Sequence, residues 1–243
     1  MKNREYTTKK PLFDTLDLNK GAILTLNKPL HWTSFDVVKK VRSILSVKKV
    51  GHAGTLDPLA TGLLLVCIGR KTKTISHYQS LEKVYTGEMV LGKTTPSLDL
   101  ETAFDSETPY EHVTETAIYA LAHSFVGNIY QTPPAYSAIK SHGKRAYKKA
   151  RQGQKVSLAP RQVFVRSFVV TSISMPRITF EVTCGKGTYI RSLVRDFGNQ
   201  LGVGAYLNTL CRTRIGPFRL EEAYEIESLP RQQHDNNALT PSS

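Results

Sequence analysis

The sequence predicts an α+β protein with a mixed, mainly antiparallel sheet and flanking helices. Stretches with helical spacing are mixed with short apolar strands, without the strict strand–helix alternation of parallel sheets. The 243 residues are 40% hydrophobic and 22% charged, which suits one sizeable core and excludes disordered and fibrous classes. We expect a domain at 21–228 between an N-terminal tail at 1–20 and a C-terminal tail at 229–243.

The individual elements follow from hydrophobic spacing and from the Gly and Pro residues that end them. Strands are expected at 21–26, before Lys28-Pro29, and at 62–68, a short apolar run with Gly at both ends. Helices are expected at 34–45, with Ser34 as the N-cap, at 114–125, and at 189–201, before Gly202. Further strands are expected at 84–91 and as a pair at 163–173 and 178–184.

Charge is strongly positive and unevenly distributed. Lys and Arg number 33 against 20 Asp and Glu, a net charge of +13. No carboxylate occurs from 116 to 180, a stretch with many cations: Lys140, Lys144, Arg145, Lys148, Lys149, Arg151, Lys155, Arg161, Arg166 and Arg177. A solvated face is the ordinary interpretation of such a run. Here one sign of charge, interleaved with Tyr130, Tyr136 and Tyr147, better fits a surface that follows nucleic-acid phosphates.

The remaining charges and special residues exclude other classes. Carboxylates gather in a separate acidic stretch that we expect to face away from RNA: Asp99, Glu101, Asp105, Glu107, Glu111 and Glu115. The longest apolar run, 63–68, is too short to cross a membrane, and no secretory signal begins the chain. Cys67, Cys184 and Cys211 form no CxxC pair, so we expect small buried residues in a reducing cytoplasm. No P-loop or metal-ligand cluster is present, so neither a cofactor nor a metal is expected.

The segment 51–62, GHAGTLDPLATG, carries the most information about chemistry. Three glycines permit tight turns or the close approach of a ligand, and Pro58 restricts the backbone beside Asp57 just before an apolar strand. Asp57 could act as a catalytic carboxylate presented on a constrained loop. It could equally form an Asx-turn that only caps its own loop. The residues alone leave both interpretations open.

This segment resembles the catalytic motif of the TruB family, which makes pseudouridine in the T-arm of tRNA. Between about 21 and 227, further stretches match the family in the same order: Asn27-Lys28-Pro29, Lys83-Val84-Tyr85, 131–140, 143–147, 185–191, 202–205 and Leu210 with Arg212-Thr213. The resemblance implies the pseudouridine synthase fold with a central RNA-binding cleft. It also implies a tRNA substrate recognised through its T-arm, a monomer, and no cofactor.

By this resemblance, Asp57 is the catalytic carboxylate. It could attack C1′ of the ribose, add to C6 of the base, or remove a proton from C2′, and the sequence does not choose among these routes. Arg191 matches the family's arginine that pairs with this aspartate; judged alone it would be a surface helix arginine. Tyr85 matches the tyrosine that stacks on the flipped base, although a lone strand tyrosine usually lies in the core.

The resemblance assigns further residues to substrate binding. His52 matches the histidine that fills the gap left by the flipped nucleotide. Tyr189 and Leu210 match pocket residues, Pro29 shapes the backbone, and Lys28 and Lys73 match lysines at the cleft. The stretch at about 127–155 corresponds to a thumb-like basic insertion over the T-arm. Gly127, Gly143 and Gly153 are its expected hinges.

The sequence also departs from the family pattern. Lys28-Pro29 is followed by Leu30-His31-Trp32, and His31 stands where many members have Gly. Cys211 stands where Arg is common. Only 16 residues follow Glu227, so no PUA domain is expected, and tRNA binding should be weaker and more dependent on the T-arm. Two alternative functions remain open: a pseudouridine synthase acting on another RNA, and a tRNA-binding folding chaperone.

Overall fold

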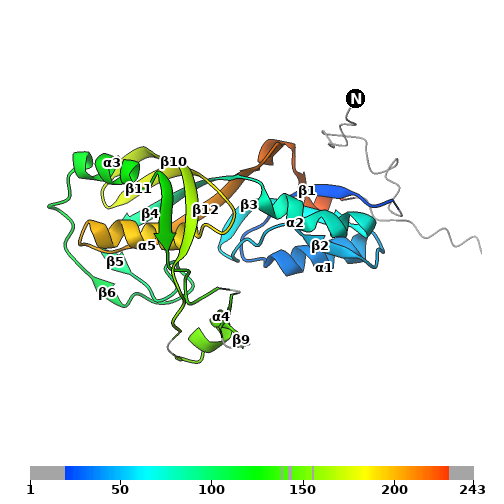
Figure 1. Cartoon of the computed structure of the whole chain (residues 1–243), viewed down its shortest axis with the longest axis horizontal. Coiled ribbons are helices and arrows are strands. Elements are labelled where there is room, and N and C mark those ends of the chain that lie inside the picture. The colour runs from blue at the N-terminus through cyan, green and yellow to red at the C-terminus, as the bar shows by residue number, and fades with distance from the viewer. Residues whose placement is uncertain (1–19, 138, 142–143, 155, 230–243) are drawn as a thin grey trace, which may run out of the picture.

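The computed structural model describes residues 20–137, 139–141, 144–154 and 156–229. One sheet runs along the molecule in the order β14-β1-β3-β12-β4-β11-β10-β7, with β2 beside β3 and β13 beside β12 (Figure 1). The bounds are β1 Ile23–Lys28, β2 Val50–His52, β3 Ala60–Ile68, β4 Lys83–Leu91, β7 Gly127–Gln131, β10 Arg161–Ser174, β11 Arg177–Cys184, β12 Ala205–Ile215, β13 Phe218–Arg219 and β14 Tyr224–Glu225. Among the strand pairs of this sheet in the described residues, β1–β14 and β3–β12 are the parallel ones and the others are antiparallel, which confirms the mixed, mainly antiparallel sheet.

Helices cover the two halves of the sheet separately. In Figure 1, α5 (Ile190–Gln200) and α3 (Glu115–Ser124) lie in one half, where they pack on β12 and β10. The other half carries α1 (Ser34–Ile44), the 3-10 helix η2 (Gly69–Thr74) and α2 (Ile75–Ser80). Two short 3-10 helices follow, η3 (Leu220–Glu222) and η4 (Ile226–Ser228). No helix in the described ranges is long and apolar enough to cross a membrane.

Two smaller hairpins project from this frame. One pairs β5 (Lys93–Thr94) with β6 (Ser106–Glu107). The other pairs β8 (Lys140–Ser141) with β9 (Lys144–Arg145) and continues into α4 (Ala146–Ala150). Figure 1 shows α4 and β9 standing well away from the sheet, below it in that view. This second hairpin lies within the predicted thumb.

Hydrophobic burial explains why the strongest predicted elements form. β3 lies between two cores: Leu64, Val66 and Ile68 face α1, while Leu63 and Leu65 face Ile215 and Phe218. All five of these β3 side chains are fully buried. Burying each contributes about 2 kcal/mol, so a continuous apolar run becomes a central strand. The predictions of this strand, and of the helix at 189–201, are confirmed.

The predicted N-cap of α1 is wrong by one residue. Thr33, not Ser34, caps the helix: its hydroxyl accepts from the Asp36 N–H at 3.0 Å, and the Asp36 carboxylate accepts from the Thr33 N–H at 3.0 Å. Asp36 stands three residues after Thr33, which completes a capping box that Ser34 cannot form. The Ser34 hydroxyl instead accepts from the Leu56 N–H at 2.9 Å and donates to Leu56 O at 3.2 Å.

β12, a strand at the centre of the sheet, is not predicted by the local sequence pattern. Its register against β4 shifts between Leu207 and Thr209 and again between Arg212 and Arg214. Each bulge interrupts the two-residue alternation that reveals a strand. Of the predicted tails, only Lys20 and Leu229 lie inside the described residues, and Leu229 is buried against the α1 core.

Candidate active site

Asp57 lies in the loop between β2 and β3, and the backbone of that loop is fixed at several points. The Ala53 N–H donates to Leu65 O at 2.8 Å, and the Ala60 N–H donates to Asp57 O at 3.1 Å. Leu56 is buried and bonded to Ser34. The Asp57 carboxylate is 38% exposed at the surface of this rigid loop. A fixed yet accessible carboxylate is the arrangement expected for reaction with a bound substrate.

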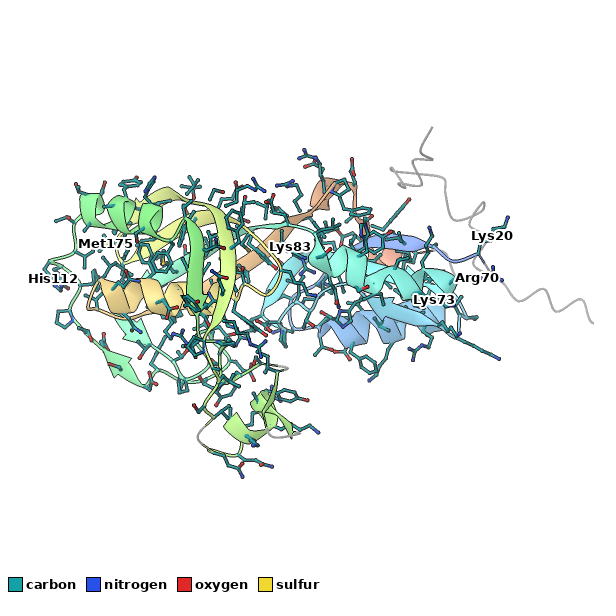
Figure 2. All side chains as sticks on the ribbon, in the orientation of Figure 1. Lys20, Arg70, Lys73, Lys83, His112 and Met175 are labelled. Atoms are coloured by element: carbon teal, nitrogen blue, oxygen red, sulfur yellow. The ribbon has the colours of Figure 1, made fainter. Side chains whose placement is uncertain are left out.

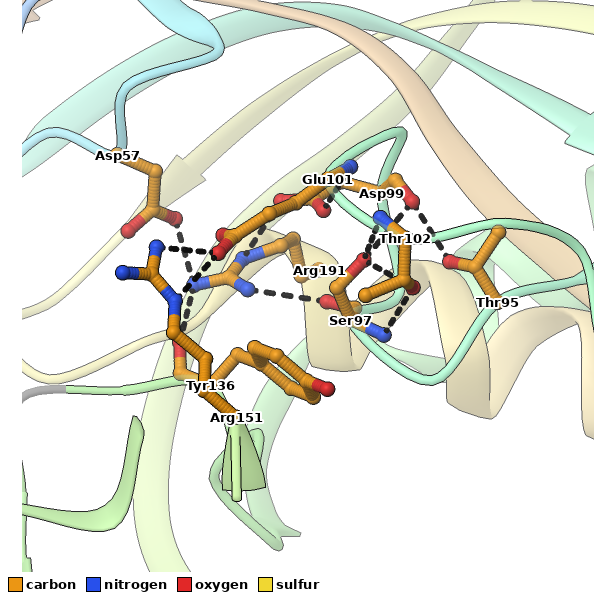
Figure 3. Close-up of polar contacts among 9 residues, drawn as sticks. All are labelled: Asp57, Thr95, Ser97, Asp99, Glu101, Thr102, Tyr136, Arg151 and Arg191. Atoms are coloured by element: carbon orange, nitrogen blue, oxygen red, sulfur yellow. Dashed lines mark hydrogen bonds and ion pairs between the residues drawn. The ribbon is translucent and has the colours of Figure 1, made fainter. Parts of the chain in front are cut away.

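Arg191, in the first turn of α5, contacts that carboxylate directly. Its Nη2 lies 2.8 Å from Asp57 Oδ2, although the arginine side chain is only 3% exposed (Figure 3). Nη1 donates to Ser97 O at 3.0 Å, Nη2 also donates to Tyr136 O at 2.9 Å, and Nε lies 3.5 Å from Asp99 Oδ2. The guanidinium is therefore held from three segments of the chain. Its cationic Nη2 is thereby fixed against the Asp57 carboxylate.

Asp99 differs from the rest of the acidic stretch, which was expected to face away from RNA, because it is buried at the candidate site. It is 4% exposed and faces Arg191, and burial raises its pKa while Arg191 opposes that rise. The turn that carries it is closed by hydroxyls, because Thr95 and Ser97 both donate to Asp99 O, at 2.7 and 3.0 Å. The turn residues Thr95-Pro96-Ser97 were the available sequence signal, but they do not reveal which distant side chain the turn meets.

Lys28 lies beneath the Asp57 loop and is fully buried. Its ammonium donates to Trp32 O at 2.7 Å, to Pro29 O at 2.9 Å and to Pro58 O at 3.4 Å. Burial lowers its pKa to about 8, although Asp57 partly counteracts this. Rather than facing the cleft, Lys28 supports the loop from behind.

The turn that follows Lys28 departs from the family pattern and braces the same loop. His31 adopts a left-handed φ of 66°, a conformation that suits the glycine common at this position. Its N–H donates to Pro58 O at 2.8 Å. Half-buried Pro29 and exposed Leu30 complete this turn. The departure therefore keeps the backbone geometry of a glycine while adding a side chain.

Tyr85 and Tyr189 approach Asp57 from two different elements. Tyr85, on β4, is only 9% exposed, and burial raises its pKa. Tyr189 is the N-cap of α5, and burial followed by the charge of Asp57 raises its pKa. The buried side chain of Gln131 holds the Tyr189 backbone, accepting from its N–H at 2.8 Å and donating to its C=O at 3.1 Å.

The other predicted pocket residues are placed differently. Leu210, on β12, lines a narrow crevice together with Asp57, Asp99 and Arg191. His52 ends β2 half-buried, and burial lowers its pKa. Lys73 is exposed on η2, and Figure 2 places it at the α1/α2 end of the molecule, away from α5. The structure thus assembles the site around Asp57 without Lys73.

Lys73 belongs instead to a second cationic surface, which we call the basic end patch. The segment before β2 and the η2 segment after β3 meet at this end. The Gly69 N–H donates to Lys49 O at 2.8 Å, and β2 pairs with β3. Figure 2 shows Arg70 and Lys73 at this end. From 37 to 81 the only carboxylate in the sequence is that of Asp57. The exposed members of the patch are Arg42, Lys48, Lys49, Arg70 and Lys73.

The cationic run at 116–180 is partly neutralised by carboxylates from distant segments. Three of its arginines form ion pairs: Arg151 with Glu101 at 2.6 Å, Arg177 with Glu88 at 2.6 Å, and Arg166 with Glu82. Each of these carboxylates lies outside the run, so the run itself still carries one sign of charge. The Arg151 pair also joins α4's end to the turn that carries Asp99 (Figure 3).

Parts of the predicted thumb and of the cysteine prediction can be placed. Gly127 and Gly153 take positive φ values of 110° and 70°, and Gly143 lies outside the described residues. Tyr130 is 76% exposed. Cys67 and Cys184 are buried as predicted, but Cys211 is only half-buried beside a groove on the open sheet face. Within the described ranges, no cluster of three His, Cys, Asp or Glu side chains could hold a metal.

Arg212 was quoted in the motif match but given no role by the sequence analysis. The structure places it 1% exposed behind the Asp57 loop and beside Tyr85. Its Nε donates to Leu63 O at 2.8 Å, and its two Nη atoms donate to Gly54 O and Thr55 O at 3.2 and 3.4 Å. The available sequence signal was the match of Arg212 to the family motif. The carbonyls that it binds could not be predicted from the sequence.

Comparisons with known proteins agree with this architecture. Residues 42–190 match the model of the TruB family pseudouridylate synthase N-terminal domain, and 191–241 match a tRNA pseudouridylate synthase B C-terminal domain. The chain belongs to the TruB family. It is 46% identical to tRNA pseudouridine synthase B of Flavobacterium johnsoniae over 85% of this chain and 93% of that protein. The Parabacteroides distasonis protein of the same name is 47% identical over 88% and 94%.

Solved structures show the same fold. A crystal structure of a Cbf5-Nop10-Gar1 complex matches with a TM-score of 0.69 and 30% identity, covering 94% of this chain and 59% of that chain. An H/ACA RNP bound to a substrate RNA containing 2′-deoxyuridine matches with a TM-score of 0.66 and 28% identity, covering 94% and 58%. The predicted pseudouridine synthase fold is therefore confirmed.

Proposed function

We propose that this protein isomerises uridine 55 in the T-arm of tRNA to pseudouridine, with Asp57 as the catalytic carboxylate. The observation that carries the proposal is the 2.8 Å contact between the accessible Asp57 carboxylate and buried Arg191, inside the segment that matches the family's catalytic motif. The names of the relatives supply the substrate class. Because Asp57, Arg191 and the lining residues come from one chain, a monomer suffices.

The reaction breaks the N1–C1′ bond, rotates the uracil and joins C5 to C1′. C5 releases its proton to solvent, and N1 takes up one proton, so the product is an isomer of the substrate. No atoms are gained from another reactant and nothing is oxidised. Asp57 acts from the rigid loop by attacking C1′, by adding to C6, or by removing the C2′ proton. Each route needs an ionised carboxylate, and the Arg191 guanidinium lies 2.8 Å from this one. In this proposal, Tyr85, Tyr189 and Leu210 enclose the uracil.

The target uridine must leave the tRNA stack before it reaches Asp57. Base flipping requires a few kcal/mol, which stacking in the pocket recovers in part. His52 fills the space left in the T-loop. We assign the T-arm to the surface between the cationic run of the thumb and the basic end patch, so that Lys73 binds phosphate rather than uracil. Such contacts release counterions and should make binding strongly salt-dependent.

The test uses unmodified tRNA labelled with tritium at C5 of its uridines, because forming pseudouridine releases that tritium to water. The wild type is compared with Asp57→Asn and with the matched control Asp105→Asn, which changes an exposed aspartate bonded to Thr94. We expect release from one T-arm uridine by the wild type and the control, and none by Asp57→Asn.

Other outcomes would replace the proposal. Release from a different position, or only from another RNA, would show a pseudouridine synthase with a different substrate. Binding and refolding of tRNA without any release by the wild type would indicate a chaperone. Equal release by wild type and Asp57→Asn would remove Asp57 from the chemistry.

A further inference from the structure

Arg212 is the largest fully buried side chain among the described residues and occupies an unusual position. It sits on β12 opposite Gly62 of β3 on one side and Tyr85 of β4 on the other. Each flanking strand is connected to one part of the candidate site. β3 directly follows the Asp57 loop, and β4 carries Tyr85.

The guanidinium of Arg212 bridges these parts. Its three nitrogens donate to carbonyls of Gly54 and Thr55, within the Asp57 loop, and of Leu63, within β3. Its central carbon lies 6.0 Å from the centre of the Tyr85 ring, within the range of a cation–π contact. One side chain thus contacts both the loop that presents Asp57 and the ring of Tyr85.

No carboxylate forms an ion pair with Arg212 anywhere in the described residues. A buried charge is normally paired, because removing it from water is unfavourable. Here carbonyl dipoles and one aromatic face replace the missing counter-ion. A neutral apolar residue could fill the same volume without that penalty, so packing alone does not account for an arginine.

Close packing leaves little freedom for a substitute. Gly62 has a φ of 101°, and a Cβ there would meet Arg212 O at 2.5 Å and Arg212 N at 2.8 Å. The backbone of Arg212 therefore lies close against β3, while its side chain extends to the carbonyls of the Asp57 loop. A lysine has one compact ammonium and cannot reproduce a planar fork that reaches three carbonyls.

We propose that Arg212 is a positioning residue for the isomerisation, fixing the Asp57 loop and the Tyr85 ring at the separation that the flipped uridine requires. The inference rests on the proposed function. Because Arg212 is buried, we assign it neither a contact with RNA nor a proton transfer. Its effect acts through Asp57 and Tyr85, so it should alter the chemical step more than tRNA binding.

The experiment measures single-turnover tritium release with enzyme in saturating excess over tRNA, for the wild type, Arg212→Met and Arg212→Lys. This rate constant describes the folded, bound enzyme, so a reduced folded fraction does not change it. Binding of tRNA is measured on the same samples by filter retention. Arg214→Met is the matched control, because Arg214 lies on the same strand but pairs with Glu82 at 3.2 Å.

We expect Arg212→Met to lower the rate constant about 100-fold, since a misplacement of about 1 Å has that effect. Binding of tRNA should change less than about threefold. Arg212→Lys should recover part of the rate, and Arg214→Met should match the wild type. An Arg212→Met rate within about threefold of the wild type would overturn the inference while leaving the proposed function intact. A wild type without activity would instead overturn the proposed function.

If Arg212→Met does not fold, the lysine variant and Leu63→Ala decide the matter. Leu63→Ala opens a cavity in the neighbouring core but keeps the carbonyl that Arg212 binds. Equal rate losses in Arg212→Lys and Leu63→Ala, at equal losses of stability, would indicate general loosening and refute a positioning role. A loss in Arg212→Lys alone supports it.

Discussion

Replacing Lys28 with Met tests how the Asp57 loop is supported. The buried ammonium donates to three carbonyls, one of them that of Pro58 beside Asp57. The pKa of Lys28 falls from 10.5 to about 8 because burial disfavours its charge. This difference corresponds to about 3 kcal/mol of unfavourable free energy when the lysine is protonated in both the folded and the unfolded chain.

The sign of the pH dependence follows from where the protons are bound. Below about pH 8 both states carry the proton, so the full penalty applies. Between about pH 8 and 10.5 the unfolded chain still binds the proton but the folded chain does not, so stability rises with pH. The stability of the wild type relative to Lys28→Met should therefore increase by about 2 kcal/mol between about pH 7 and pH 9.5.

Urea denaturation at several pH values measures this difference directly. Subtracting the two proteins removes the titration of all groups that they share. Lys39→Met is the matched control: Lys39 is an exposed lysine on α1, and its difference from the wild type should stay nearly constant with pH. Parallel curves for wild type and Lys28→Met would refute a buried, proton-losing Lys28.

Three further substitutions test the site and the surfaces. Arg191→Met leaves the carboxylates of Asp57 and Asp99 without their cation. It should abolish tritium release and lower the free energy of unfolding, measured in urea, by about 3 kcal/mol. Near-normal stability would contradict the buried ion pairs. Lys73→Met should reduce the slope of log affinity against log salt by about 0.9 in filter binding, and an unchanged slope would exclude a phosphate contact. Gly62→Ala should destabilise the protein by more than about 3 kcal/mol in thermal unfolding, because its Cβ would strike Arg212 backbone atoms. Gly187→Ala is its control, since that site has a positive φ but no atom within 4 Å, and an equal loss would exclude the clash.

Local sequence patterns predicted the elements that bury a clear hydrophobic face. The run at 62–68 became β3, and the stripe at 189–201 became α5, with ends within two residues. β12 could not be recognised, because its bulges break the alternation and its parallel partner β3 is far away in sequence. Short-range patterns report burial, whereas strand order depends on which distant segments meet.

The same distinction applies to the candidate site. The sequence singled out Asp57 because its motif is contiguous, and Arg191 because a second motif matched the family; their catalytic roles stay predictions. Nothing local connects Asp99 to Arg191 or Arg212 to the Asp57 loop, since each contact spans more than ninety residues. The expectation that the acidic stretch faces away from RNA assumed that all its carboxylates lie on one surface. In the structure, its first member is buried at the site.

The unequal exposure of the two carboxylates gives Arg191 an asymmetric environment. Asp99 is 6% exposed at its side chain and lies against Nε, whereas Asp57 is 38% exposed and contacts Nη2. Asp99 is closed off from solvent together with the guanidinium, so it can orient the arginine but cannot readily meet a substrate. Asp57 can receive the substrate because only one of its sides is held. A pair made of Asp57 and Arg191 alone would leave the guanidinium free to follow the carboxylate as it reacts. In the proposed reaction, Asp99, Ser97 O and Tyr136 O hold the arginine, so the counter-charge stays in place while the bonding of Asp57 changes.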